Sequence, residues 1–137
     1  MGSLLARLKE LETNLQELSR FKTLTLEQIE SDRKLVWALR YGMLESIQIV
    51  IDIACAIVSH DNLGYPKSYA DCLRLLGQAS YLDEALTRRL AQAVGMRNIL
   101  IHEYLDVDDA ILFAALDRLS DLRDFAAAIA DAGRDTT

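Results

Sequence analysis

Apolar residues recur at helical spacing near both ends of the chain. Close to the N-terminus they follow alternating steps of four and three residues, at Leu4, Leu8, Leu11, Leu15 and Leu18. A second series, in steps of three and four, runs from Leu112 to Ile129. Such stripes are typical of amphipathic helices that cover a core with one face. One helix is therefore predicted to begin near residue 3 and to carry the first stripe, and another helix is predicted over the second series.

The pattern in the middle of the chain predicts a longer helix, from residue 25 to about residue 59. Thr25 and Gln28 have the spacing of a capping box, which starts a helix. Over residues 47–58 the apolar side chains cover an arc of roughly 200°, about twice what a surface helix needs. This excess predicts burial from two sides, either inside a bundle or across a subunit interface.

Polar residues mark where the remaining helices begin. Ser68, with Asp71 three residues later, is predicted to open a short helix after a loop that contains the only Pro. Asp83 is predicted to cap the next helix, and Asp106 or Asp108 the last one. Together the patterns predict an all-α fold, an up-and-down helical bundle of four long helices plus one short helix.

The composition agrees with a compact helical protein. Apolar residues make up 51% of the chain, and 137 residues are enough for one domain with a core of its own. We predict a single domain over residues 1–132 and a disordered tail over residues 133–137. No apolar run reaches the ~18 residues that a membrane span needs, so no membrane association is expected.

Two further features favour a cytoplasmic protein. The N-terminal residues lack the pattern of a secretory signal. Cys55 and Cys72 lie in apolar surroundings, at a spacing that suggests neither a disulfide framework nor a metal site. They are predicted to be free, buried thiols, as is usual in a reducing compartment.

The net charge of −6 argues against non-specific affinity for nucleic acid, which normally rests on a basic surface. A protein of this charge that acts on nucleic acid needs its positive side chains concentrated around one cleft.

Residues 97–104, Arg-Asn-Ile-Leu-Ile-His-Glu-Tyr, bring three chemically useful side chains together. Arg97 offers a planar, permanently charged fork that suits phosphate oxygens. His102 can take and give a proton near neutral pH. Tyr104 adds a hydroxyl group that both donates and accepts hydrogen bonds. The stretch is therefore the candidate functional site of the chain.

Written as R-x4-H-x-Y, this stretch resembles the signature of the HEPN ribonucleases, and more narrowly of the HepT-like toxins. Gly95 and Met96 before it and the acidic run over residues 106–109 after it also fit that family. The resemblance covers roughly residues 25–130, and residues 97–104 are its only specific motif.

The resemblance implies a metal-independent endoribonuclease toxin of a type VII-like toxin–antitoxin pair, which needs no cofactor. Arg97 would bind the scissile phosphate of an RNA substrate, and His102 would move a proton. A minimal nucleotidyltransferase antitoxin would neutralise the toxin by transferring AMP to Tyr104. The family also implies a two-fold homodimer.

Helical geometry limits how these residues can meet. At ~100° per residue, Arg97 and Tyr104 share nearly one face of a straight helix, whereas His102 lies about 140° from Arg97. Either the helix loosens around His102, or two chains build one cleft. Further side chains that could line the cleft are Arg33, Arg40, Asn98 and Asp52, of which the two arginines share a helix face. Capping explains the acidic residues after the motif more simply than a metal site does.

Two other functions fit the same residues. One is a non-catalytic HEPN-type module that binds a nucleotide or a nucleotidyltransferase partner. The other is a purely structural helical protein, in which Arg97, His102 and Tyr104 are solvated or capping groups. An open cleft in which His102 of one chain lies within reach of Arg97 of the other chain would favour an enzyme, and a His102 packed into the core would favour the structural protein.

Overall fold

The structure, a computed structural model, describes residues 2–135. These residues form seven α-helices and three short 3-10 helices, and they contain no strand. The helices are α1 (Gly2–Arg20), α2 (Leu26–Glu30), α3 (Arg33–His60), α4 (Tyr69–Gln78), α5 (Glu84–His102), α6 (Asp109–Ala114) and α7 (Leu119–Asp135), with η1 (Phe21–Thr23), η2 (Tyr104–Asp106) and η3 (Ala115–Arg118) between them. The predicted all-α bundle is confirmed.

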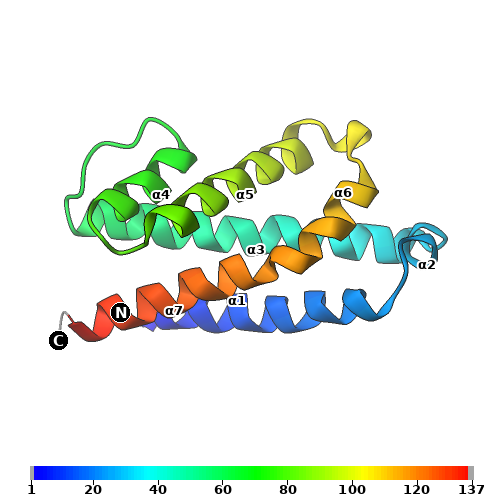
Figure 1. The fold of residues 1–137 in the computed structure, drawn as a ribbon, viewed down its shortest axis with the longest axis horizontal. Coiled ribbons are helices and arrows are strands. Elements are labelled where there is room, and N and C mark those ends of the chain that lie inside the picture. The colour runs from blue at the N-terminus through cyan, green and yellow to red at the C-terminus, as the bar shows by residue number, and fades with distance from the viewer. Residues whose placement is uncertain (1, 136–137) are drawn as a thin grey trace.

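Helix α3 is the axis of the molecule, and the other long helices lie on two sides of it (Figure 1). Helices α1 and α7 cover one side, and α4 and α5 cover the other. Ile51, Ile53 and Ala54 of α3 are completely buried between these layers. The wide apolar arc of α3 is thus filled inside the bundle, so it does not require a subunit interface.

Helix α3 is also the one described helix that is long and apolar enough to cross a membrane by length and composition. Its most apolar window has a mean hydropathy of 1.7, although no uninterrupted apolar run reaches that length. Since α3 packs against α1, α4, α5 and α7, its position at the centre of the bundle accounts for this composition.

The single helix predicted from residue 25 to residue 59 is wrong at one point. The capping box of Thr25 and Gln28 is present, but it opens only the short α2. Helix α2 ends at Glu30. Two residues later, the Asp32 carboxylate accepts a hydrogen bond from the backbone N–H of Lys34 at 3.0 Å. Short polar side chains compete in this way for backbone donors, and Asp32 therefore begins α3 as a new helix.

The predicted caps of the later helices are confirmed. Ser68, Asp83 and Asp108 each accept a hydrogen bond from a backbone N–H in the first turn of α4, α5 and α6. The last predicted helix is interrupted by η3. Helix α7 continues to Asp135, inside the stretch predicted as a tail, and residues 136 and 137 lie outside the described residues. The tail stays a prediction.

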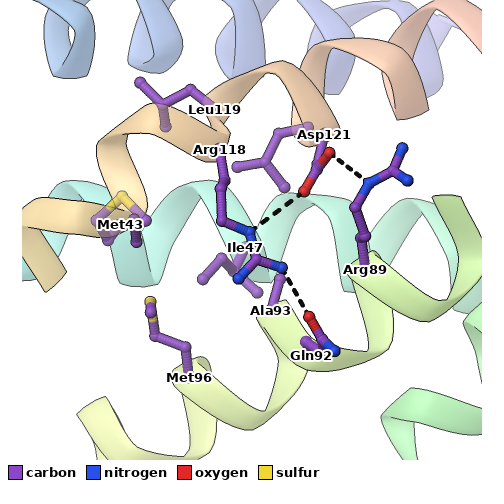
Figure 2. A pocket seen from close by; sticks show the side chains of 11 residues that line it. Met43, Ile47, Arg89, Gln92, Ala93, Met96, Arg118, Leu119 and Asp121 are labelled. Carbon is purple, nitrogen blue, oxygen red and sulfur yellow. Dashed lines mark hydrogen bonds and ion pairs between the residues drawn. The ribbon is translucent and has the colours of Figure 1, made fainter. Parts of the chain in front are cut away.

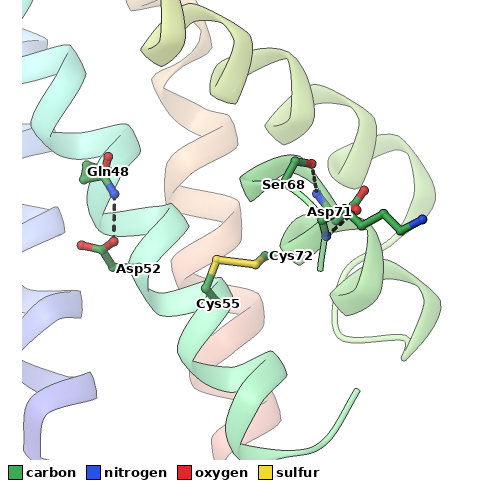
Figure 3. Close-up of a disulfide and its surroundings, with 7 residues drawn as sticks. Gln48, Asp52, Cys55, Ser68, Asp71 and Cys72 are labelled. Atoms are coloured by element: carbon green, nitrogen blue, oxygen red, sulfur yellow. Dashed lines mark hydrogen bonds between the residues drawn. A yellow bond between two sulfur atoms is a disulfide. The ribbon is translucent and has the colours of Figure 1, made fainter. Parts of the chain in front are cut away.

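The prediction of free thiols is wrong, because Cys55 of α3 and Cys72 of α4 form a disulfide (Figure 3). Their Cα atoms are 5.1 Å apart, although 17 positions separate them in the sequence. The loop between the helices turns the chain back and lays α4 along α3, which places the two residues opposite each other. Neither residue type nor spacing in the sequence shows that contact.

Candidate functional site

A groove of about 650 Å³ lies where α3, α4 and α5 meet. It is lined by Cys55, Pro66, Lys67, Ser68, Tyr69, Ala70, Cys72, Val94, Arg97, Asn98 and His102. Two of these side chains are cationic, one is an imidazole, and none carries a carboxylate. The groove therefore concentrates positive charge on a chain whose net charge is −6. This arrangement meets the requirement that the acidic composition set for binding nucleic acid.

Arg97 is held in a fixed orientation by three neighbours on three elements. Its Nε donates to Oε1 of Gln48 at 2.9 Å, and its Nη1 donates to Oδ1 of Asn98 at 3.0 Å. The guanidinium carbon lies 5.0 Å from the centre of the Tyr69 ring, a cation–π contact. Within the described residues, Nη2 has no hydrogen bond, so Arg97 is oriented but still able to bind an anion.

Asp52 does not line the groove but contacts Gln48, which in turn contacts Arg97. Gln48 and Asp52 are four residues apart on α3, and the Gln48 Nε2 group donates to the Asp52 carboxylate at 2.8 Å (Figure 3). Because an ionised carboxylate only accepts, this bond turns the Gln48 carbonyl towards Arg97. Asp52 was predicted to line the cleft, but it does not; its contact with the site runs through Gln48.

His102 is the last residue of α5, and it is exposed. Helix α5 ends there because Glu103 leaves helical geometry, with φ −129° and ψ 38°. The His102 side chain lines the same groove as Arg97, and no other described side chain holds its ring. Arg97 and His102 belong to the same continuous helix α5, and both line this groove. The expectation that the helix must loosen, or that two chains must build the cleft, before these two side chains can meet is therefore wrong.

Tyr104 does not share a face with Arg97, and that prediction is wrong because α5 stops two residues earlier. Tyr104 begins η2, is 63% exposed and lines a different hollow, of about 290 Å³. The other residues of this hollow are Trp37, Arg40, Tyr41, Leu44, Leu100 and Val107. A hydrogen bond with Glu45 raises the pKa of Tyr41, which lines this hollow, above its usual value. Because Tyr104 and Arg97 line different hollows, the candidate site has two separate parts.

The two arginines predicted to line the cleft lie away from Arg97. Arg40 makes a two-pronged ion pair with Asp109, at 2.9 and 3.0 Å, and lines the hollow of Tyr104. Arg33 is the exposed first residue of α3 and lines none of the hollows described here. Of the acidic run, Asp108 caps α6 and Asp109 neutralises Arg40, and the described residues hold no cluster suited to a metal ion.

A third hollow, of about 50 Å³ between α3, α5 and α7, is structural (Figure 2). At its edge the nearly buried Asp121 accepts a hydrogen bond from Arg89 at 2.8 Å. Arg118 approaches the same carboxylate at 3.7 Å and donates to Gln92 at 2.7 Å. These contacts join α5 to η3 and α7. Arg89 therefore stabilises the packing of the bundle and does not extend the groove.

A family model described as Ribonuclease HepT-like matches residues 11–129 of the chain. The chain belongs to this family. It is 29% identical to the mRNA nuclease HepT of Shewanella oneidensis over 99 residues, which are 72% of this chain and 74% of that protein. The predicted enzyme class, a ribonuclease, is confirmed.

Solved structures agree with the fold of this HepT-like chain. A tri-AMPylated Shewanella oneidensis HEPN toxin, solved in complex with an MNT antitoxin, superposes with a TM-score of 0.85 at 23% identity, over 93% of this chain and 96% of that one. The cytosolic protein YutE of Bacillus subtilis, of unknown function, superposes with a TM-score of 0.84 at 18% identity, over 95% of this chain and 87% of that one.

Sequence reasoning missed three residues of the site in this HepT-like ribonuclease. Gln48 is one of the few polar residues in the apolar second half of α3, together with Glu45, Asp52 and Ser59. Their narrow strip is a signal that could have suggested contact with another helix. Tyr69 and Lys67 lie next to the Ser68 cap of α4, and nothing in their local sequence connects them with Arg97. The packing of α4 against α3 and α5 brings them to the groove.

Proposed function

We propose that the chain is a metal-independent endoribonuclease toxin of a type VII-like toxin–antitoxin pair, with Arg97 and His102 as its catalytic residues. The observation that carries this proposal is that both side chains line one groove free of carboxylates. Arg97 is already oriented there by Gln48, Asn98 and Tyr69, so little reorganisation is needed when substrate binds.

The groove supports cleavage by attack of a ribose 2′-hydroxyl on the neighbouring phosphate. Arg97 binds the scissile phosphate through the donors that its fixed contacts leave open and stabilises the charge that develops there. His102 takes the proton of the attacking hydroxyl or delivers one to the leaving oxygen. A second proton-transfer group is supplied by another His102 if two chains join their grooves around one substrate.

The test is RNA cleavage by the purified protein in EDTA. Arg97→Lys should lower the cleavage rate by about 10²-fold or more, because an ammonium group replaces neither the bidentate fork nor its hydrogen bonds to Gln48 and Asn98. The matched control is Arg88→Lys, an exposed arginine of α5 that does not line the groove. A strict need for divalent metal would contradict the mechanism. Absence of cleavage by the wild type would favour the non-catalytic, nucleotide-binding module.

We also propose that a minimal nucleotidyltransferase antitoxin is the partner and that it transfers AMP to Tyr104. The Tyr104 residue is 63% exposed, so its hydroxyl group is accessible to a second protein. The Shewanella toxin of the same fold was solved both AMPylated and bound to such an antitoxin. We also propose a cytoplasmic location, because the proposed RNA substrate and antitoxin partner both require one.

We also propose a homodimer, as the family resemblance implies. The apolar arc of residues 47–58 is filled inside the bundle, so the candidate interface is the first half of α3 instead. Trp37 and Tyr41, one turn apart, are 62% and 64% exposed and border the same hollow. Apolar side chains gathered in this way are typical of protein interfaces.

If this surface joins two copies, Trp37→Glu should convert a dimer into a monomer without loss of helical content, because an unpaired charge in an interface is costly. Light scattering at micromolar concentration gives the mass. Leu5→Glu, at an exposed apolar position of α1, is the control and should leave the mass unchanged. A monomeric wild type would contradict the homodimer, and a dimeric Trp37→Glu protein would contradict this surface.

A further inference from the structure

The groove is longer than its two catalytic side chains require. A phosphate group held by Arg97 and His102 would occupy only the α5 side of the groove, which extends to residues 66–70 at the start of α4. Its volume of about 650 Å³ is in the range of sites that hold a whole small molecule. The α4 side of the groove therefore has room for the nucleoside attached to the phosphate.

Tyr69 supplies a flat surface at this end. It is 45% exposed although it borders the groove, and the Arg97 guanidinium lies over one face of its ring, 5.0 Å from the ring centre, so the other face is left for a base. Nucleobases stack on exposed aromatic rings in proteins that bind single strands, and the gain depends little on which base it is. A base stacked on this free face would be separated from Arg97 by the thickness of the Tyr69 ring, a separation that the nucleoside attached to a phosphate on Arg97 can span.

Lys67 places a cation two residues before Tyr69. Its backbone N–H donates to the Asp71 carboxylate at 2.9 Å, and the Asp71 N–H donates to the Ser68 hydroxyl at 3.2 Å (Figure 3). These bonds fix the backbone of the segment. The Lys67 side chain is exposed, and its ammonium group has no ion pair in the part of the chain that the structure describes. It is free to contact a phosphate of the next nucleotide.

We propose that residues 67–69 form a nucleoside subsite, in which Tyr69 stacks on the base next to the scissile phosphate and Lys67 contacts an adjoining phosphate. The proposal rests on the function proposed above, since it adds a base-binding part to the Arg97 and His102 groove. It gives the enzyme a preference for single-stranded RNA, because a base inside a duplex cannot stack on a protein side chain.

The experiment measures binding of a fluorescein-labelled oligoribonucleotide by anisotropy, with the non-cleaving His102→Ala protein as background. In that background Tyr69→Leu should weaken binding about tenfold, which is the size of one base–aromatic stack, and Tyr69→Phe should bind as the parent does. Tyr65→Leu is the matched control, because Tyr65 is 99% exposed and lies outside the groove.

Tyr69→Leu also removes the contact with Arg97, so a second measurement separates the two roles. Oligonucleotides with an abasic ribose at each position in turn are bound to the His102→Ala protein with and without the Tyr69→Leu change. Loss of one particular base should weaken binding about tenfold when Tyr69 is present and hardly at all when it is replaced. Equal losses in both proteins would overturn the subsite and leave Tyr69 as a support for Arg97 only.

Lys67 is tested through the salt dependence of the same binding. Lys67→Gln should reduce the slope of log affinity against log salt by about 0.7, the value for one phosphate contact on a single strand. Lys9→Gln, on the exposed face of α1, should leave the slope unchanged. An unchanged slope in Lys67→Gln would remove Lys67 from the subsite. A failure of the proposed function would be recognised by a different result, because the wild-type protein would then not cleave RNA at all.

Discussion

His102→Ala protein is expected to lose RNA cleavage by at least about 10²-fold, because the substitution removes the group that moves the proton. The fold should be unaffected, since His102 is exposed at the end of α5 and no other described side chain bonds to its ring. Cleavage of a labelled RNA in EDTA gives the rate, and circular dichroism checks the helical content.

His60→Ala is the matched control for this experiment. His60 is the other histidine of the chain, and it also ends a helix, with its ring hydrogen-bonded to Asp61 at 2.8 Å. Hydrogen bonds from Tyr81 and from His60 lower the pKa of Asp61, so this cluster belongs to the end of α3. His60→Ala should therefore cleave RNA at the wild-type rate. Full activity of His102→Ala protein would show that the proposed catalytic residue is not the one that transfers the proton.

The helices of the bundle could be predicted because the signals for them, apolar periodicity and capping residues, lie within a few residues of each helix. The leucine stripe of α1 places Leu11, Leu15 and Leu18 in the core, and each polar cap fixes the start of one helix through a backbone bond a few residues away. The break at Asp32 escaped prediction although it is local too. Apolar periodicity continues across it, whereas a single side-chain bond decides that α2 and α3 are separate helices.

The site was predictable only where the motif itself contains it. Arg97, Asn98 and His102 border the groove, as expected, but the groove is completed by residues of α4 that packing brings there. The separation of Tyr104 from Arg97 depends on where α5 ends, and one residue in non-helical geometry at Glu103 determines that. The Cys55–Cys72 disulfide likewise depends on the contact between α3 and α4, which no spacing in the sequence encodes.

Incubation with the proposed minimal nucleotidyltransferase antitoxin and ATP is expected to add AMP to Tyr104 and to abolish cleavage. The Tyr104 oxygen attacks the α-phosphorus of ATP, a phosphodiester forms, and pyrophosphate leaves. Although Tyr104 lies outside the groove, it follows His102 by two residues, across a helix end. A nucleotide on Tyr104 therefore brings a negative charge and considerable bulk to the α5 end of the groove, where the RNA phosphate must bind.

The modification is located by mass spectrometry and its effect measured by RNA cleavage. Tyr104→Phe protein should cleave RNA, gain no AMP and resist neutralisation by the partner's transferase activity, because only the acceptor oxygen is missing. Tyr65→Phe removes the hydroxyl of an even more exposed tyrosine, 99% against 63%, and should be modified and silenced like the wild type. If AMP is added to Tyr104→Phe protein and still silences it, the switch lies on another residue. If Tyr104 is modified but cleavage continues, then charge and bulk at the end of α5 do not reach the substrate phosphate.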